Sequence, residues 1–512
     1  MSPRAVCLST LLVALAQTAA AQLVTIKTVP VAQGDQFDIF PSHTFGMAGV
    51  SIAVADSLLD PFVNPAKGAR VGTARFFSAP TVYGMSRGAG GGRTLPFAAI
   101  ASSGGWYGGI SLVLQEVDAS WAPGQDGPIF AQARDVVRLD TAAASVAAVP
   151  PRRDSYGNQY AFAMLGRALP GGGLSFGGSV LWSRLRGIDG VDLLYAGSAG
   201  LKQAGHAVDV RVGFLKEWSG ERSLEALVLH NRFDMTHDVG YLDLFWDPGT
   251  QRTLQRARLE HNRDQTNTWG LHLEYERPVA AAGWRIGWLA TVNRMSHPKL
   301  PEYELANVPV IPRDPGYSSA YNVGVGLSKA RGPATFGIDV IYEPIWSYTW
   351  ADAASPVATA TGDTIPAGGK TVENHFRFSN ALFRMGFSRE LELRGLGRAV
   401  GLQLGLVLHS IHYWLAQYDN VQAAGRKLEE SWLEWTPTWG LSLRFPDLEI
   451  RYRGRATHGT GRPGVEPSGC IACVAAPDAF AGGNILVAPT GPLALQKVTT
   501  TTHQISLSLP IR

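Results

Sequence analysis

The sequence is poor in charged residues. Asp, Glu, Lys and Arg make up 17% of the 512 residues, and 45 basic residues against 42 acidic ones leave a formal net charge of +3. A chain that binds nucleic acid needs a clear basic excess, so we expect no nucleic-acid partner. Aromatic residues make up 10% of the chain, and this share together with the low charge excludes a disordered polypeptide.

A long apolar helix is also missing. The first 21 residues contain Arg4, an apolar run over 5–16 and three alanines at 19–21, which are the features of a cleavable secretory signal peptide. Beyond Gln22 no apolar run approaches the roughly 18 residues that a transmembrane helix needs. We therefore expect an exported mature chain without a helical anchor.

Cysteine is scarce as well. Of the three cysteines, Cys7 lies in the signal segment, so the mature chain has only Cys470 and Cys473. Their CxxC spacing allows half a zinc site, a redox pair, a small disulfide loop or two free thiols. A zinc site needs a second pair of ligands and a redox motif needs a strand-to-helix setting, so a disulfide or free thiols are favoured. We expect no metal and no cofactor.

Period-two alternation runs along the whole chain, whereas no long stretch shows a helical repeat of similar strength. In one example apolar residues at 269, 271, 273 and 275 alternate with Gly270, His272, Glu274 and Glu276. The alternation predicts strands near residues 71–83, 94–103, 106–118, 157–169, 173–186, 206–217, 222–231, 266–277, 283–296, 317–329, 333–347, 374–388, 400–416, 431–445, 447–456 and 500–511.

The connections between these strands alternate in length. Tight turns are expected near 104–105, 170–172, 218–221, 330–332 and 446, and long loops near 119–156, 187–205, 232–265, 297–316, 348–373, 417–430 and 457–499. Short turns at one rim and long loops at the other are typical of bacterial outer-membrane barrels. The long strands favour this class over a soluble sandwich, and so do the aromatic residues at the long-loop ends, among them Tyr413, Trp414 and Trp432. The sequence therefore predicts an all-β fold, a transmembrane antiparallel β-barrel of about 14–16 strands in the outer membrane.

The region before the first strand breaks the alternation. It has Gly46 and Gly49 in a Gly-rich stretch, an Ala-rich stretch that ends at Asp56, and then Asn64-Pro65-Ala66. The order and spacing of these residues resemble the N-terminal region of the FadL-type outer-membrane transporter family, which includes carriers of long-chain fatty acids and aromatic hydrocarbons. The resemblance implies that residues 22–67 fold into the lumen as a plug and that residues 68–512 form the barrel.

Two alternatives accompany this resemblance. Elementary chemistry explains the same residues as turn formers, since glycine permits close packing and Asn-Pro ends one element before another begins. The N-terminal pattern is also similar to that of barrel proteins that act as shuttles in protein secretion. In addition, the chain ends Pro510-Ile511-Arg512, whereas bacterial barrels commonly end in an aromatic residue.

Two further candidate sites follow from the barrel hypothesis. Gly108 and Gly109 lie in the strand at 106–118, the third by our count, and in the FadL-type family the third strand is kinked to form a lateral opening. Their alternative role is to give room to the plug or to shape a turn. An apolar cluster in the loop at 232–265 is a candidate for capture of a hydrophobic solute, unless the loop buries it in a core of its own. The cluster comprises Tyr241, Leu242, Leu244, Phe245 and Trp246.

The one match to an enzyme motif in the sequence lacks the context that the motif requires. Residues 84–88 match GxSxG, but the glycines that follow cannot start the helix that a nucleophile elbow requires. We expect a non-enzymatic protein that takes up hydrophobic small molecules passively and whose partners are outer-membrane lipid and the solute. The rival hypothesis is a barrel scaffold or shuttle that binds a protein partner in secretion or at the cell surface. A third hypothesis is that the barrel is an enzyme.

Overall fold

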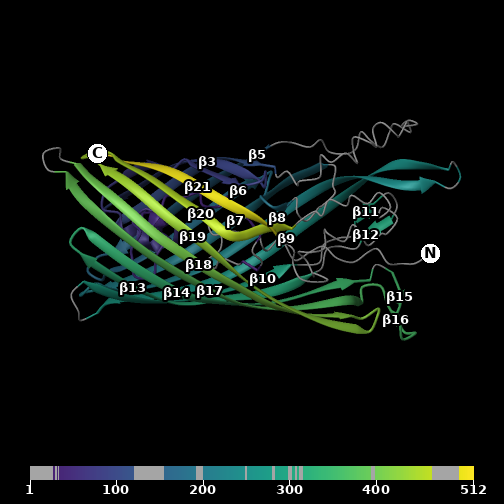
Figure 1. Ribbon diagram of the computed structural model, residues 1–512. Helices are drawn as coiled ribbons and strands as arrows, with labels where there is room; N and C mark the ends of the chain where they lie inside the picture. The colour runs from purple at the N-terminus through teal and green to yellow at the C-terminus, as the bar shows by residue number, and fades with distance from the viewer. Residues whose placement is uncertain are drawn as a thin grey trace.

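Seventeen antiparallel strands hydrogen-bond into one sheet that closes on itself (Figure 1). The computed structural model describes residues 27–28, 31–32, 34–119, 155–191, 200–247, 249, 251–279, 283–297, 303–305, 308–310, 315–353, 355–393, 398–463 and 495–511. The wall strands are β1 (Arg75–Ser78), β2 (Thr81–Met85), β3 (Gly91–Ser103), β4 (Trp106–Asp118), β5 (Ser155–Leu169), β6 (Leu174–Leu185), β7 (Gly200–Trp218), β8 (Arg222–Asp247), β9 (Arg252–Pro278), β10 (Trp284–His297), β13 (Gly316–Arg331), β14 (Ala334–Asp352), β17 (Lys370–Leu393), β18 (Arg398–Asp419), β19 (Ala424–Arg444), β20 (Glu449–Pro463) and β21 (Leu495–Pro510).

The first and last strands close the barrel. Both β1 and β2 pair with β21 on one side and β3 on the other, in the same register, and only the segment Ala79-Pro80 separates them. Proline has no backbone N–H to give to the ladder, which accounts for the interruption. Because β1 and β2 share one position, the wall is a closed barrel of 16 strands, and the predicted fold class is confirmed.

All sixteen predicted ranges coincide with wall strands, but the predictions of long loops at 232–265 and 417–430 are wrong. Strands β18 and β19 stay paired as far as Asp419 with Ala424, so a tight turn of residues 420–423 connects them. Strands β8 and β9 are 26 and 27 residues long and stay paired from Ser223 with Glu276 to Asp247 with Arg252. The resulting hairpin extends well beyond the neighbouring strands (the teal hairpin at the right of Figure 1). The sequence of residues 252–263, in the distal half of β9, is rich in charge and lacks the alternation on which the strand prediction depended.

Four short elements lie outside the wall sheet. They form two small ribbons, β11 (Tyr303–Leu305) with β12 (Val308–Val310) and β15 (Val357–Ala358) with β16 (Thr364–Ile365). Within the described ranges, no helix has the length and apolar character needed to cross a membrane.

The two faces of the wall differ in chemistry. Exposed apolar side chains cover the outward face, for example Leu112, Val323 and Leu404, each more than half exposed. Glu274 and Asp339, which the alternation predicts on the lumenal face, are buried inside. Two of the aromatic residues that the sequence assigns to the membrane belt, Tyr413 and Trp432, face the lumen instead, where their rings stack with centroids 5.5 Å apart.

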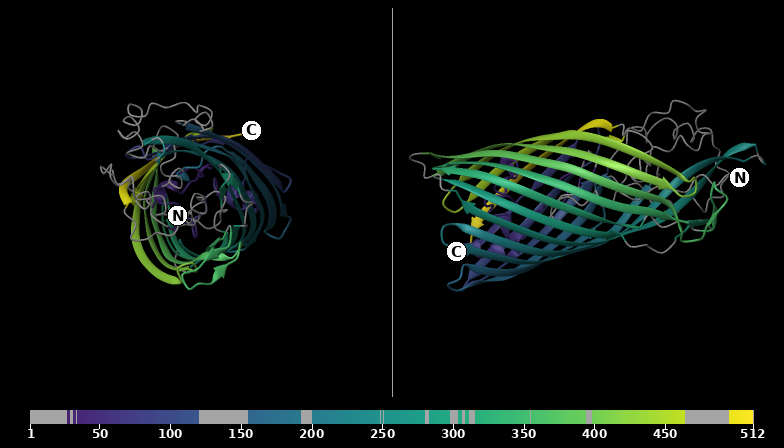
Figure 2. Two further views of the ribbon diagram at one scale, coloured as in Figure 1. Left: turned by 90° about the vertical axis from the view of Figure 1, so that its right-hand side faces the viewer. Right: turned by 90° about the horizontal axis from the view of Figure 1, so that it is seen from below.

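The N-terminal segment lies inside the barrel. The end-on view shows purple segments within the ring of strands (left panel of Figure 2). Its regular elements are η1 (Phe45–Met47), α1 (Asp60–Val63) and η2 (Pro65–Arg70). We call residues 31–70 the lumenal segment.

Candidate functional site

One end of the lumenal segment packs on a row of glycines in the wall. Gly166, Gly177 and Gly213 are direct cross-strand neighbours on the inward face of β5, β6 and β7. A Cβ atom at Gly177 would lie 2.6 Å from the carbonyl of Pro65, so this contact exists only because the wall has no side chain there. The Ala66 carbonyl accepts hydrogen bonds from Ser175 Oγ at 3.0 Å.

Asn64 joins this end of the segment to the wall. Its side-chain oxygen accepts a hydrogen bond from the Ala66 N–H at 3.1 Å and caps η2, and its Nδ2 donates to Glu225 of β8 at 3.4 Å. Asn64 is completely buried, so both bonds compensate for its lost hydration. The Asn-Pro-Ala motif therefore caps η2 and docks this end of the segment on the wall.

Buried charges reinforce the same contact. Lys67 Nζ lies 2.9 Å from Glu225 Oε2 and 3.7 Å from Asp60 Oδ2. Burial raises the pKa of Asp60 to about 6, and the Lys67 ammonium acts against that shift. Buried ion pairs contribute little net stability, but removing one partner is costly, so they fix the position of the segment.

A second set of wall glycines receives residues 47–52. Gly337, Gly386 and Gly405 are cross-strand neighbours on β14, β17 and β18, and Gly287 pairs with Gly326 on β10 and β13. A Cβ at any of these positions would overlap the backbone or side chains of residues 47–52. We call these five glycines and the three on β5–β7 together the glycine seat of the segment.

Hydrogen bonds fix the Gly-rich stretch on this seat. The Ala48 N–H donates to Thr438 Oγ1 at 2.9 Å, and the same hydroxyl donates to the Gly46 carbonyl at 2.9 Å. Asp339 of β14 accepts from the Ser51 N–H at 2.8 Å. Gly49 has a φ of 66°, a left-handed conformation that glycine adopts without strain.

Asp56 has an internal role. It is buried and accepts hydrogen bonds from Ser42 Oγ at 2.6 Å and from the N–H groups of Thr44, Leu58 and Leu59 at 3.1 Å each. A carboxylate with four such donors closes the segment into a compact loop.

The beginning of the segment contacts β20. Arg455 Nε donates to Asp35 Oδ2 at 2.9 Å, and Arg455 Nη2 donates to Asp38 Oδ2 at 2.5 Å. Val31 forms a parallel bridge with Gly461, and the Ala32 N–H donates to the Gly461 carbonyl at 2.6 Å. The lumenal segment therefore contacts the wall on opposite sides of the barrel.

One group of residues has the composition of a metal site. Glu225, His272 and Glu274 bring ligand atoms within 4.8 Å of one another, the only such group that the described ranges contain. The Lys67 ammonium lies beside Glu225, and His272 Nδ1 lies 2.7 Å from Thr291 Oγ1. A cation from the protein already balances these carboxylates, so we interpret the group as part of the docking contact.

The lumen contains a packed cluster of apolar side chains between the segment and strands β3–β8, which we call the apolar compartment. Phe40 of the segment stacks on Phe62 with ring centroids 4.2 Å apart, and both rings contact Phe162 of β5 at 5.3 and 5.1 Å. The compartment continues along the inward faces of β3 to β8 to Val239. A second apolar cluster lies on the inward faces of β10, β13, β14, β17 and β18, and comprises Met295, Ala320, Ile345, Phe376, Phe378, Tyr413 and Leu415.

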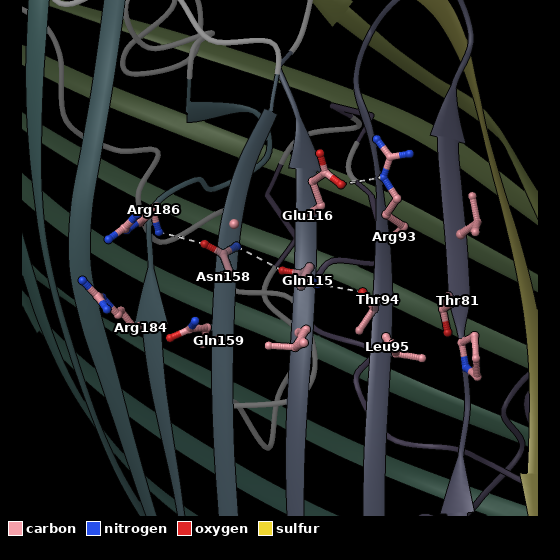
Figure 3. A pocket seen from close by; sticks show the side chains of 14 residues that line it. Thr81, Arg93, Thr94, Leu95, Gln115, Glu116, Asn158, Gln159, Arg184 and Arg186 are labelled. Atoms are coloured by element: carbon pink, nitrogen blue, oxygen red, sulfur yellow. Dashed lines mark hydrogen bonds and ion pairs between the residues drawn. The ribbon is translucent and has the colours of Figure 1, made fainter.

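A chain of buried amides connects the wall to the segment. Gln115 Nε2 donates to Thr94 Oγ1 at 2.9 Å, and Asn158 Nδ2 donates to Gln115 Oε1 at 3.0 Å (Figure 3). Gln115 also donates to the Gln36 carbonyl, and Gln36 Nε2 donates to the Gly187 carbonyl at 2.8 Å. Segment and wall thus share one hydrogen-bond network, which ties the position of the segment to β3–β6.

The other predicted site residues have mixed outcomes. Gly108 and Gly109 lie in unbroken ladders with β3 and β5 without a register shift, and the lateral opening stays a prediction. The apolar capture cluster belongs to β8, and its side chains lie outside the described residues. Cys470, Cys473 and the signal segment also lie outside them. Ser86 of the GxSxG match lies in the turn after β2, where it bonds to Thr499.

Fold and lumen together define a closed transmembrane β-barrel that encloses its own N-terminal segment. No protein-family model matches the sequence, and no curated protein matches it.

Solved structures with similar folds include outer-membrane transporters. A FadL homologue from Pseudomonas aeruginosa is 12% identical with a TM-score of 0.44, and the match covers 94% of this chain and 100% of that protein. The toluene transporter TbuX from Ralstonia pickettii is 10% identical with a TM-score of 0.39, over 92% and 97% of the two chains. A bacterial polysaccharide outer-membrane secretin is 7% identical with a TM-score of 0.36, over 86% and 99%. Similarity at this level does not assign a function.

Proposed function

We propose that this protein is a FadL-type outer-membrane transporter that takes up hydrophobic small molecules passively, with long-chain fatty acids or aromatic hydrocarbons as substrates. The observation that carries the proposal is the apolar compartment around Phe40, Phe62 and Phe162 inside the lumen. A channel for polar solutes gains nothing from such a lining. An apolar solute, in contrast, gains about 0.8 kcal/mol for each methylene group removed from water.

In the proposed pathway, residues 22–67 act as a plug. Solute binds first at the apolar cluster of the β8–β9 hairpin and then enters the lumen. It passes along the apolar compartment above the glycine seat, since the docked segment blocks a direct aqueous path. Release requires either a shift of the plug or an opening in the wall. The concentration gradient supplies the driving force, and the proposal assigns no catalytic step.

Reconstitution into vesicles tests this function. Vesicles that contain the purified protein should take up radiolabelled oleate or toluene faster than protein-free vesicles and should exclude a small sugar. Replacement of Phe162 by Gln places an amide in the apolar compartment without a partner, which should slow uptake of the apolar solute. Sugar permeation that equals or exceeds oleate uptake in the unmodified protein would contradict the proposal.

A second function is favoured by the β8–β9 hairpin, which extends beyond the other strands (Figure 1). A projecting two-stranded ribbon is a suitable surface for a protein partner in secretion or at the cell surface. Deletion of residues 236–262 separates the two functions. A shuttle loses partner binding in this variant while the barrel remains assembled. A carrier instead loses uptake at low solute concentration, where capture by the apolar cluster limits the rate, and recovers uptake at high solute concentration.

A further inference from the structure

Two arginines without acidic partners project from the outward face where β6 ends. Arg184 and Arg186 are exposed and lie two residues apart, on the face of the strand that carries Trp182. Figure 3 shows their guanidinium groups turned toward each other. The nearby Glu116 and Asp118 instead bind Arg93, at 2.9 and 3.2 Å, and no acidic residue in the described part of the chain pairs with either arginine.

The wall beside the arginines is hollowed. A hollow of about 560 Å³ extends from β2 to β6, and its lining includes Gly157 of β5, both arginines and the Arg93–Glu116 ion pair. Gln159 is the cross-strand neighbour of Arg184 and places an amide donor at the edge of this hollow. Three donor groups therefore surround one outward-facing concavity.

From the sizes of the outward side chains we infer an apolar groove that leads from the hollow toward the middle of the membrane. Along β5 the next two outward residues are small, Ala161 and Ala163. Larger side chains flank them on both sides, because Leu112 and Trp182 are the neighbours of Ala161, and Ile110 and Val180 those of Ala163. The groove begins where the charged residues end, on the side of the barrel that carries the long loops.

This arrangement identifies the ligand chemistry. Two converging guanidinium groups repel each other, and an anion between them removes that cost. Arginine binds phosphate through paired N–H donors, and the rim with the long loops faces the outer leaflet in bacterial barrels. We propose that Arg184, Arg186 and Gln159 bind the phosphate group of an outer-leaflet lipid, with an acyl chain in the groove over Ala161 and Ala163. This site is independent of any transported solute.

Lipid A binding to the detergent-solubilised barrel tests the site. We expect the double variant Arg184→Gln/Arg186→Gln to bind lipid A about tenfold or more weakly than the unmodified barrel, because it loses two charge-assisted contacts. Lipid A without its phosphates should bind the unmodified barrel with a similarly reduced affinity. The variant Ala161→Leu/Ala163→Leu, which fills the groove and keeps both arginines, should also weaken binding.

A matched control separates this site from general charge. Arg167 and Arg277 are exposed arginines at the short-turn rim, where they lie over Trp106 at 5.1 Å and Trp288 at 5.7 Å. Arg167→Gln/Arg277→Gln removes the same charge and should leave lipid A affinity unchanged, and heat-modified gel mobility verifies that each variant is folded. Equal affinity of the Arg184/Arg186 variant and the unmodified barrel would overturn the proposal. Displacement of lipid A by millimolar inorganic phosphate would overturn the lipid as the ligand, because it would identify a site for free phosphate.

Discussion

Gly213 of β7 lies directly beneath the side chain of Asn64, so that a methyl group at position 213 would occupy the place of the Asn64 amide. This relationship joins the wall to the lumenal segment at the motif that the sequence singled out. It also makes the position of the segment testable with a single added carbon atom.

Gly213→Ala should therefore displace the Asn-Pro-Ala end of the segment. The overlap costs about 1–3 kcal/mol, and we expect it to raise the conductance of the barrel for small ions in planar bilayers. Gly178→Ala is the control, since it adds the same methyl group to the lipid-facing side of β6, where the nearest atom is 3.8 Å away. Equal conductance of the two variants would show that the segment does not depend on the glycine row.

Lys67→Met should weaken the docking of the lumenal segment more than Gly213→Ala does. The change leaves Glu225 and Asp60 buried without their shared cation, at a cost of about 3–5 kcal/mol. The measurement is the urea concentration at which added protease cleaves the segment. Lys67→Met/Glu225→Gln should recover part of the loss, because it also removes one of the unbalanced carboxylates. If the double variant is as weak as Lys67→Met alone, the contact between the two side chains does not hold the segment.

Deletion of residues 22–60 tests the plug itself. The wall strands pair without help from this segment, so we expect the shortened chain to assemble and to leak small polar solutes. Swelling of vesicles in sugar solutions measures the leak. A truncated barrel that conducts no more than the intact one would show that the segment does not block the lumen.

Gly108→Val/Gly109→Val tests the lateral opening. If this part of β4 belongs to the exit path, the variant should assemble and show reduced uptake of hydrophobic solute. Ile110→Val, a mild change on the lipid-facing side of the same strand, is the control. Uptake at the unmodified rate from a correctly assembled double variant would remove these glycines from the pathway.

Outer-membrane insertion is the simplest prediction. The outward face carries apolar side chains such as Leu112, Val323 and Leu404, which no soluble protein exposes around its whole circumference. The folded chain should fractionate with the outer membrane and migrate differently on gels before and after heating. Recovery of the folded protein from the soluble periplasm would contradict this prediction.

Local sequence patterns predicted the wall because period two is a local property. The same property explains the errors. Tyr413 and Trp414 are adjacent, so only one of them can face lipid, yet both were assigned to the aromatic belt. In the outer half of the β8–β9 hairpin the sequence of residues 252–263 is rich in charge and does not alternate, so it resembled a charged loop.

The contacts between the lumenal segment and the wall leave a weaker signal in the sequence than the strands do. Glycines such as Gly386 and Gly405 occupy inward positions between large outward residues, and this pattern marks a surface against which a backbone packs closely. The pairing of Arg455 with Asp35 joins residues far apart in the chain, and a single sequence contains no local trace of it.

The pairing of β1 with β21 has a consequence for how the molecule forms. Arg75 meets Pro510, so the final strand must be present before the seam can exist. The lumenal segment contacts strands from β4 to β21, so the surface on which it docks is complete only when those strands have paired. Contacts between such distant parts of the chain form slowly, because a very long loop must be ordered first. The N-terminal residues can therefore make their final contacts with the wall only after the C-terminal strands have taken their places in it.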